Sequence, residues 1–150
     1  MTVKDFYKNY DYNARAPYFV KQEELTEEQW RKLTESDTFC MLPWMHFHAF
    51  PDGRAYPCCL GEAEYPVGSV REQTMREIWN DEPMREMRKN MLADRPCREC
   101  TRCYEQEASG FFSGRRSANK HHGHHIKKLG SNPFELTYWD IRFSNLCNLR

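Results

Sequence analysis

The fold of this chain is organised around one stretch, Cys40-Met-Leu-Pro-Trp-Met-His-Phe-His-Ala-Phe-Pro-Asp-Gly-Arg-Ala-Tyr-Pro-Cys58-Cys59. Residues 44–50 suit a strand, Pro51-Asp52-Gly53 is a strong turn signal, and residues 54–58 can return antiparallel. Such a hairpin would bring Cys40 and Cys58 together. A soft-metal site built from thiolates needs four of them, so the hairpin supplies half of one.

A second cysteine group can complete that site. It reads Cys97-Arg-Glu-Cys100-Thr-Arg-Cys103 and follows Pro96, which interrupts a predicted helix, so it lies on a turn whose backbone N–H groups can point at sulfur. Four thiolates select zinc or an iron–sulfur cluster, and the residues alone leave open both the metal and the choice of two ligands from this group. Cys59 is left out, because neighbouring residues of a strand point to opposite faces.

The composition is that of a small, aromatic-rich domain that needs a bound metal or a cross-link to stabilise its fold. Its 150 residues are enough for one domain, with nine Phe, eight Tyr and four Trp. The formal net charge is zero, which argues against a nucleic-acid partner. We find no secretory signal and no membrane span, so we expect a cytoplasmic protein without membrane contact. In that compartment seven cysteines with Cys-x-x-Cys spacing predict metal ligands before disulfides.

Capping signals and periodicity predict short helices after an irregular N-terminal arm. A capping box at residues 26–29 begins a helix over about residues 27–35. A second helix opens at residues 74–79. A third, capped by Asn80 or Asp81, places an apolar stripe inward as pliable core filler, formed by Met84, Met87, Met91 and Leu92.

The C-terminal third divides into a polar connector and a strand. Residues 110–132 are rich in Gly, Ser, basic residues and His, and we interpret them as a connector with a basic face that meets an acidic substrate, a partner or only solvent. That face would contain Arg115, Arg116 and Lys120, with Lys127 and Lys128. The four histidines around Gly123 could bind a divalent metal, and we favour their interpretation as polar connector residues. Residues 134–143 alternate in polarity, which predicts a strand.

Histidines of the first predicted strand lie near the proposed metal site. His46 and His48 are two apart and therefore share one face of the strand. We expect them to be core residues or hydrogen-bond donors beside the metal, because four thiolates already complete its coordination.

In combination, these motifs resemble the SPASM/twitch auxiliary domain of radical S-adenosylmethionine (radical SAM) enzymes. The resemblance covers about residues 38–108 and rests on Cys40, Gly53 and Cys58 at their spacing, the helix at residues 75–79 and the later Cys-x-x-Cys. It implies a hairpin followed by helices around one [4Fe–4S] cluster, as in the single-cluster twitch type. The implied ligands are Cys40, Cys58, Cys100 and Cys103, with Cys97 as the alternative.

The C-terminal residues carry a second resemblance. Residues 139–150, Trp-Asp-Ile-Arg-Phe-Ser-Asn-Leu-Cys-Asn-Leu-Arg, are similar to the first barrel strand and the start of the CxxxCxxC motif of radical SAM cores. Cys147 would be the first ligand of that motif's cluster. The next cysteine would fall at position 151, so we expect a piece of a longer enzyme, with S-adenosylmethionine bound only by the full-length protein. Catalysis by this chain alone is left open, because the catalytic core is incomplete.

The expected fold is therefore α+β: a small β-hairpin and short helices around a four-cysteine cluster, with a C-terminal strand that would start a (β/α) radical SAM barrel. We expect an arm and short helix over residues 1–36, a cluster-binding domain over 37–109, a connector over 110–132 and the barrel strand over 133–150. The expected role is electron relay or organisation of a substrate site, with the missing barrel as partner and a peptide or small molecule as substrate. The competing hypothesis is a structural zinc-binding interaction module without catalysis.

Overall fold

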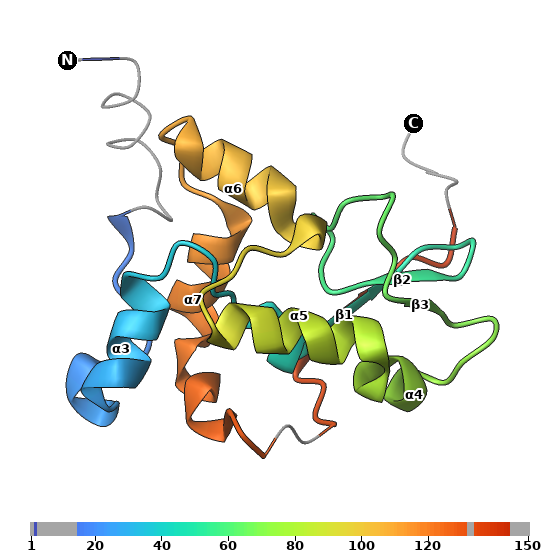
Figure 1. The fold of residues 1–150 in the computed structure, drawn as a ribbon, viewed down its shortest axis with the longest axis horizontal. Helices are drawn as coiled ribbons and strands as arrows, with labels where there is room; N and C mark the ends of the chain where they lie inside the picture. Colours follow the sequence, from blue (N-terminus) through green and yellow to red (C-terminus); the bar gives the residue numbers. More distant parts are fainter. Residues whose placement is uncertain (1, 3–14, 132–133, 145–150) are drawn as a thin grey trace.

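The protein is an α+β structure with a small mixed sheet and several short helices (Figure 1). The computed structural model describes residue 2, residues 15–131 and residues 134–144. Its elements are η1 (Gln22–Glu24), α3 (Glu27–Thr34), η2 (Leu42–Trp44), β1 (His46–Ala49), β2 (Arg54–Tyr56), β3 (Gly68–Ser69), α4 (Met75–Asn80), α5 (Glu82–Leu92), η3 (Arg98–Cys100), α6 (Thr101–Ala108), α7 (Gly114–His122), η4 (Gly123–Lys128) and β4 (Tyr138–Ile141).

The predicted hairpin is confirmed. β1 and β2 pair antiparallel, with His48 opposite Tyr56. The turn needs its glycine, because Gly53 adopts a φ of 94°, in the left-handed region that side chains with a Cβ disfavour. Cys40 precedes η2 and Cys58 follows β2, so both lie beyond the same end of the hairpin.

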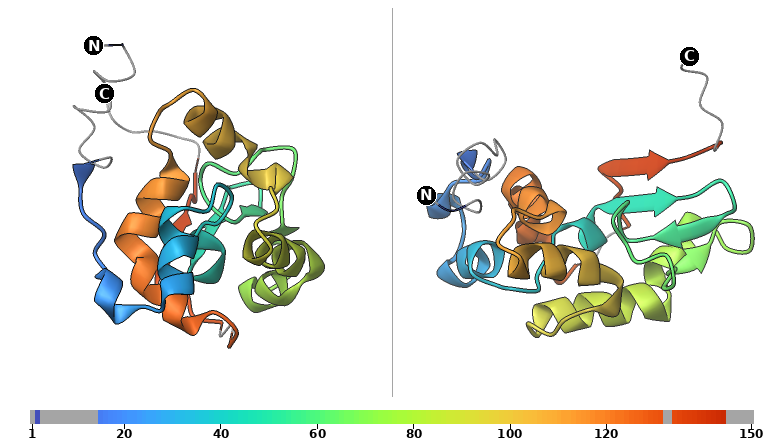
Figure 2. Two further views of the ribbon diagram at one scale, coloured as in Figure 1. Left: turned by 60° about the vertical axis from the view of Figure 1, so that its left-hand side comes forward. Right: turned by 90° about the horizontal axis from the view of Figure 1, so that it is seen from above.

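The C-terminal strand joins the hairpin's own sheet. The strand order is β3-β2-β1-β4, and β4 runs parallel to β1 with Phe47 opposite Trp139. β4 is therefore an edge strand, as the view from above shows (Figure 2). It is shorter than the predicted strand over residues 134–143, and its side chains are half-exposed to exposed, with Trp139 at 59%.

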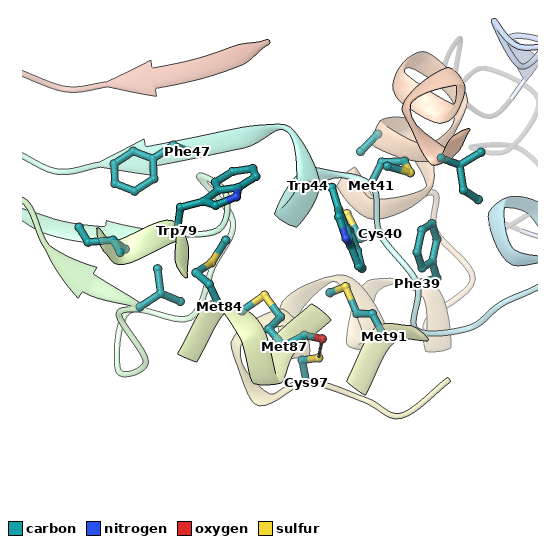
Figure 3. Packing of buried hydrophobic residues seen from close by; sticks show 14 of the residues in the cluster. Phe39, Cys40, Met41, Trp44, Phe47, Trp79, Met84, Met87, Met91 and Cys97 are labelled. Carbon is teal, nitrogen blue, oxygen red and sulfur yellow. Dashed lines mark hydrogen bonds between the residues drawn. The ribbon is translucent and has the colours of Figure 1, made fainter. Parts of the chain in front are cut away.

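The helices after the hairpin begin where their caps predict. Thr26, Thr74 and Asp81 cap α3, α4 and α5, and the first two also form capping boxes. α5 places Met84, Met87 and Met91 in the core, with Met84 nearest Trp79 of α4 and Met91 toward Trp44 (Figure 3). Leu92, predicted on the same face, is instead 43% exposed, because it lies at the last residue of the helix.

The predicted connector is not a loop. Residues 114–122 form α7 and residues 123–128 form the 3-10 helix η4. α7 packs beside α3 and η2 at the end of the molecule away from β3 (Figure 2). Ser113 caps it by accepting a hydrogen bond from the Arg116 N–H. The helix is polar in composition yet buries Arg115, Asn119 and Lys120, so its polarity does not mean exposure.

In the part of the chain that the structure describes, no helix combines the length and apolar character needed to cross a membrane. Most of the irregular N-terminal arm and Cys147 lie outside the described residues.

Candidate metal centre

Four cysteines predicted as ligands line one cavity of about 270 Å³. They are Cys40, Cys58, Cys100 and Cys103. Cys40 and Cys58 lie just before and just after the hairpin, and the other two lie in η3 and α6. The turn after β2, the first turn of α7 and Tyr138 of β4 also line the cavity. Segments separated by about sixty residues in sequence therefore meet around a common space.

The Cys40 segment is irregular, and side chains of α7 hold it. The Asn119 amide oxygen accepts from the Met41 N–H at 2.9 Å, and its Nδ2 donates to the Phe39 carbonyl at 3.0 Å and to the Leu33 carbonyl at 3.2 Å. Asn119 is fully buried. A buried amide that uses both its donor and its acceptor fixes the backbone on each side of Cys40. Cys40 lies outside the strands, so its neighbours have no strand hydrogen bonds to hold them.

The other ligand segments are tied to one another by the backbone and by Tyr104. The Glu62 N–H, four residues after Cys58, donates to the Glu99 carbonyl at 3.0 Å, next to Cys100. The Tyr104 hydroxyl, in the first turn of α6, donates to the Thr38 carbonyl at 3.3 Å. These two contacts bring the turn after β2 and the Cys40 segment to the N-terminal end of α6.

Backbone N–H groups point at three of the four sulfurs. The Leu42 N–H lowers the pKa of Cys40, the Leu60 and Gly61 N–H groups lower that of Cys58, and the Gly114 and Arg115 N–H groups lower that of Cys103. The last two belong to the first turn of α7, where the helix dipole also favours a negative charge. Each of these hydrogen bonds favours the thiolate over the thiol.

Burial opposes that effect and dominates it. It raises the pKa of Cys58 to about 12 and raises those of Cys40, Cys100 and Cys103 as well. The negative charge of neighbouring thiolates further raises the pKa values of Cys40, Cys58 and Cys100, and Cys100 is affected by all three of the other predicted ligands. For Cys103 the charge that raises the pKa is that of Glu107. Thiols that line one cavity away from water need a bound cation to remain deprotonated together.

Cys97, the alternative ligand, faces a different environment. Its sulfur lies 3.6 Å from the Met87 carbonyl oxygen, among the methionines of α5 (Figure 3). It is buried and is not part of the cavity lining. The cavity thus brings Cys100 and Cys103 to Cys40 and Cys58, and leaves Cys97 in the core.

Cys59 also lines the cavity, contrary to the argument that excluded it. The predicted strand extended to Cys58, but β2 ends at Tyr56. Cys59 lies in the following turn, where side chains do not alternate between two faces. Unlike its neighbour, Cys59 is exposed.

The two strand histidines are buried, as predicted, and one of them lines the cavity. His46 Nδ1 lies 2.9 Å from the Tyr138 carbonyl oxygen, which can only accept, so Nδ1 carries the hydrogen. Burial lowers the pKa of His46 to about 4. His48 Nδ1 lies 3.1 Å from a carboxylate oxygen of Asp140, and burial lowers its pKa although Asp140 acts in the opposite direction.

Two of the five residues of the predicted basic face are buried, whereas Lys127 and Lys128 are exposed. Arg115 is buried against Glu107, and the Lys120 ammonium donates to the Ala16 carbonyl at 2.7 Å from a buried position. Arg116 is partly exposed and pairs with the same Glu107 at 3.3 Å. The surface left for an acidic substrate or partner is therefore smaller than the sequence predicts.

The histidines at the end of α7 and in η4 make ring contacts. His122 stacks on Tyr138 at a centroid distance of 5.7 Å, and His124 lies 4.1 Å from His125. Within the described ranges, no group of three or more His, Cys, Asp or Glu side chains has the geometry to hold a single metal ion.

One family model matches this part of the chain. Residues 40–104 match the model of the SPASM family, an iron-sulfur cluster-binding domain. The match begins at Cys40 and ends one residue after Cys103, so it contains all five cysteines that line the cavity. Searches of curated proteins and of solved structures found no match. The SPASM match supports iron–sulfur cluster binding by this segment.

Sequence reasoning missed the residues of α7 that hold the cysteine segments. Asn119 and Arg115 occur in a stretch with the composition of a loop, and their partners lie about eighty residues away. The available signal was Ser113, a good N-cap, followed by nine residues without proline.

Proposed function

We propose that the chain is an auxiliary [4Fe–4S] domain of a radical SAM enzyme, with Cys40, Cys58, Cys100 and Cys103 as the cluster ligands. The observation that carries the proposal is the convergence of these four thiols on one cavity. The SPASM match over residues 40–104 supports the iron–sulfur part of it.

The donor set fits such a cluster. Four cysteines supply the usual ligands of a [4Fe–4S] group, and N–H groups directed at three of the sulfurs are the kind of contact that tunes such centres. When bound, the cluster would accept and release one electron. Because four protein ligands leave no iron open, electron relay or organisation of a neighbouring substrate site is favoured over direct ligation of substrate.

Anaerobic purification of the chain tests the metal. We expect a brown protein with broad visible absorption, and with iron and acid-labile sulfide near four of each per chain. A colourless protein with one zinc would overturn the cluster and leave the structural zinc module, whose ligand thiolates need only surround a single ion.

Single cysteine variants test the ligand set. Cys58→Ala should lose the cluster together with much of the stability, because ligand binding contributes directly to folding. Cys97→Ala should retain the wild-type iron content, since its sulfur faces the Met87 carbonyl. Cys147→Ala should also retain it. Full iron content in Cys58→Ala, or loss of iron in Cys97→Ala, would show that the ligand set is wrong.

The radical SAM part of the proposal rests on the resemblance of residues 139–150 and needs a separate test. In it, Cys147 begins the motif for a second cluster, and the remaining barrel, in the same gene or on a separate chain, is the partner. The coding sequence after Arg150 decides this: a cysteine at position 151 and alternating strands and helices beyond it would support the proposal, and their absence would overturn it.

A further inference from the structure

Arg115, a residue that the sequence places in a polar connector, lies in the interior between two of the cysteine segments. Its side chain is 2% exposed. Nη1 donates to the carbonyls of Ser36 and Phe39, both at 2.8 Å. The Phe39 carbonyl belongs to the peptide bond that joins Phe39 to Cys40, so the guanidinium holds the backbone directly at the first ligand.

The other side of the same guanidinium holds α6. Arg115 Nε donates to Glu107 Oε1 at 2.9 Å, and Nη2 pairs with the second carboxylate oxygen in a bidentate contact. Glu107 lies four residues after Cys103 in α6, and therefore one turn along the same helical face. A single side chain thus joins the segment of Cys40 to the helix of Cys103.

The backbone of Arg115 adds a further contact to the same site. Its N–H and that of Gly114 lower the pKa of the Cys103 thiol. The positive charge of Arg115 also acts on both Cys40 and Cys103, where it favours the thiolates. Lysine could reproduce the charge but not the planar fork that reaches two carbonyls and a carboxylate together.

We propose that Arg115 is a positioning residue for the cluster: its guanidinium fixes the Cys40 segment against α6, and its buried positive charge raises the cluster's reduction potential. This inference rests on the proposed cluster function. Reduction means uptake of one electron from a low-potential reductant such as dithionite, with no bond formed or broken and no proton exchanged at Arg115. The reduced cluster carries one more negative charge, which a nearby buried cation stabilises.

The test is a potentiometric titration of the full chain, purified anaerobically and reduced with dithionite, alongside iron content. Arg115→Met removes both the fork and the charge. We expect lower iron content and, in the cluster that remains, a roughly tenfold less favourable reduction, equivalent to about 59 mV more negative for one electron. Arg115→Lys keeps the charge, so its potential should stay near wild type while its iron content falls.

Glu107→Gln should shift the reduction potential in the direction opposite to Arg115→Met. It removes a buried negative charge from the same site and keeps a side chain of the same size, so the potential should become less negative. Arg116→Met is the matched control, because Arg116 also contacts Glu107 but is 37% exposed and lies in better-screened surroundings. It should shift the potential much less than Arg115→Met does.

The results separate this inference from the function on which it rests. A wild-type chain without iron would overturn both. A brown wild-type chain whose Arg115→Met and Glu107→Gln variants keep its potential, or shift in the same direction, would overturn only the role of Arg115. An equal shift in Arg116→Met would do the same. If Arg115→Met retains no cluster, its loss supports positioning, and the sign of the Glu107→Gln shift decides the electrostatic part.

Discussion

α7 and β4 reverse the usual relation between composition and burial. α7 consists mainly of Arg, Lys, His, Ser and Asn, yet Arg115, Asn119 and Lys120 are buried. β4 reads Tyr-Trp-Asp-Ile, yet Trp139 is 59% exposed and Tyr138 is 43% exposed. The polar helix is buried because the irregular cysteine segment has backbone groups that need hydrogen-bond partners. The apolar strand is exposed because it forms the edge of the sheet.

The largest expected contrast is between two aromatic residues that face each other in the β1–β4 register. Phe47 is 1% exposed and packs in the core, whereas Trp139, opposite it, lies on the edge strand. Phe47→Ala should lower the free energy of unfolding by about 3–5 kcal/mol. Trp139→Ala should lower it by less than about 1 kcal/mol. Urea unfolding of both variants measures the difference, and equal losses would mean that β4 is covered as fully as β1.

The second prediction concerns the contribution of Asn119, in α7, to the free energy of unfolding. Asn119→Ala should cost about 2–4 kcal/mol, because it leaves the buried Met41 N–H and the Leu33 carbonyl without these partners. Asn80→Ala is the control, since Asn80 is exposed and donates only to Arg76 within α4. Urea midpoints that fall equally in the two variants would show that α7 does not hold the cysteine segment.

The junction between β1 and β4 should make stability depend on pH. An unfolded histidine has a pKa of about 6.5, and burial lowers that of His46 to about 4. Between those values the unfolded chain binds a proton that the folded protein does not, so stability falls as the pH drops. For His46 the loss from about pH 7 to about pH 5 should approach 2 kcal/mol.

Urea unfolding of wild type and His46→Asn at both pH values measures that dependence. The amide of the variant can still donate to the Tyr138 carbonyl but does not titrate in this range. His48, whose pKa is also lowered, should leave a smaller dependence in the variant. An unchanged dependence in His46→Asn would assign the effect to other groups.

The smallest expected effect concerns the start of α7. Ser113→Ala removes the N-cap that accepts from the Arg116 N–H at 3.1 Å, at a cost of about 1 kcal/mol. Thr26→Ala removes the equivalent cap of α3, whose hydrogen bond is exposed. We expect the Ser113 variant to lose more, because Ser113 is buried and also donates to Glu107. A smaller loss at Ser113 would contradict the view that α7 is part of the core.

The elements that sequence analysis predicted correctly have local causes. The hairpin follows from Pro51-Asp52-Gly53, and α3, α4 and α5 follow from caps within a few residues of each start. Leu92 was placed wrongly because periodicity gives a face but not the point at which the neighbouring elements end. Cys59 was placed wrongly because strand alternation was extended past Tyr56.

The sequence by itself determined the donor chemistry: seven cysteines, and spacings that resemble one iron–sulfur domain family. Only the tertiary structure decided that Cys100 and Cys103 face the same cavity as Cys40 and Cys58, and that Cys97 turns toward Met87. It also decided that the polar helix α7 is buried. The physical reason is the same for the cysteines and for α7. Their positions depend on packing and on hydrogen bonds between residues far apart in the chain, which no local sequence pattern contains.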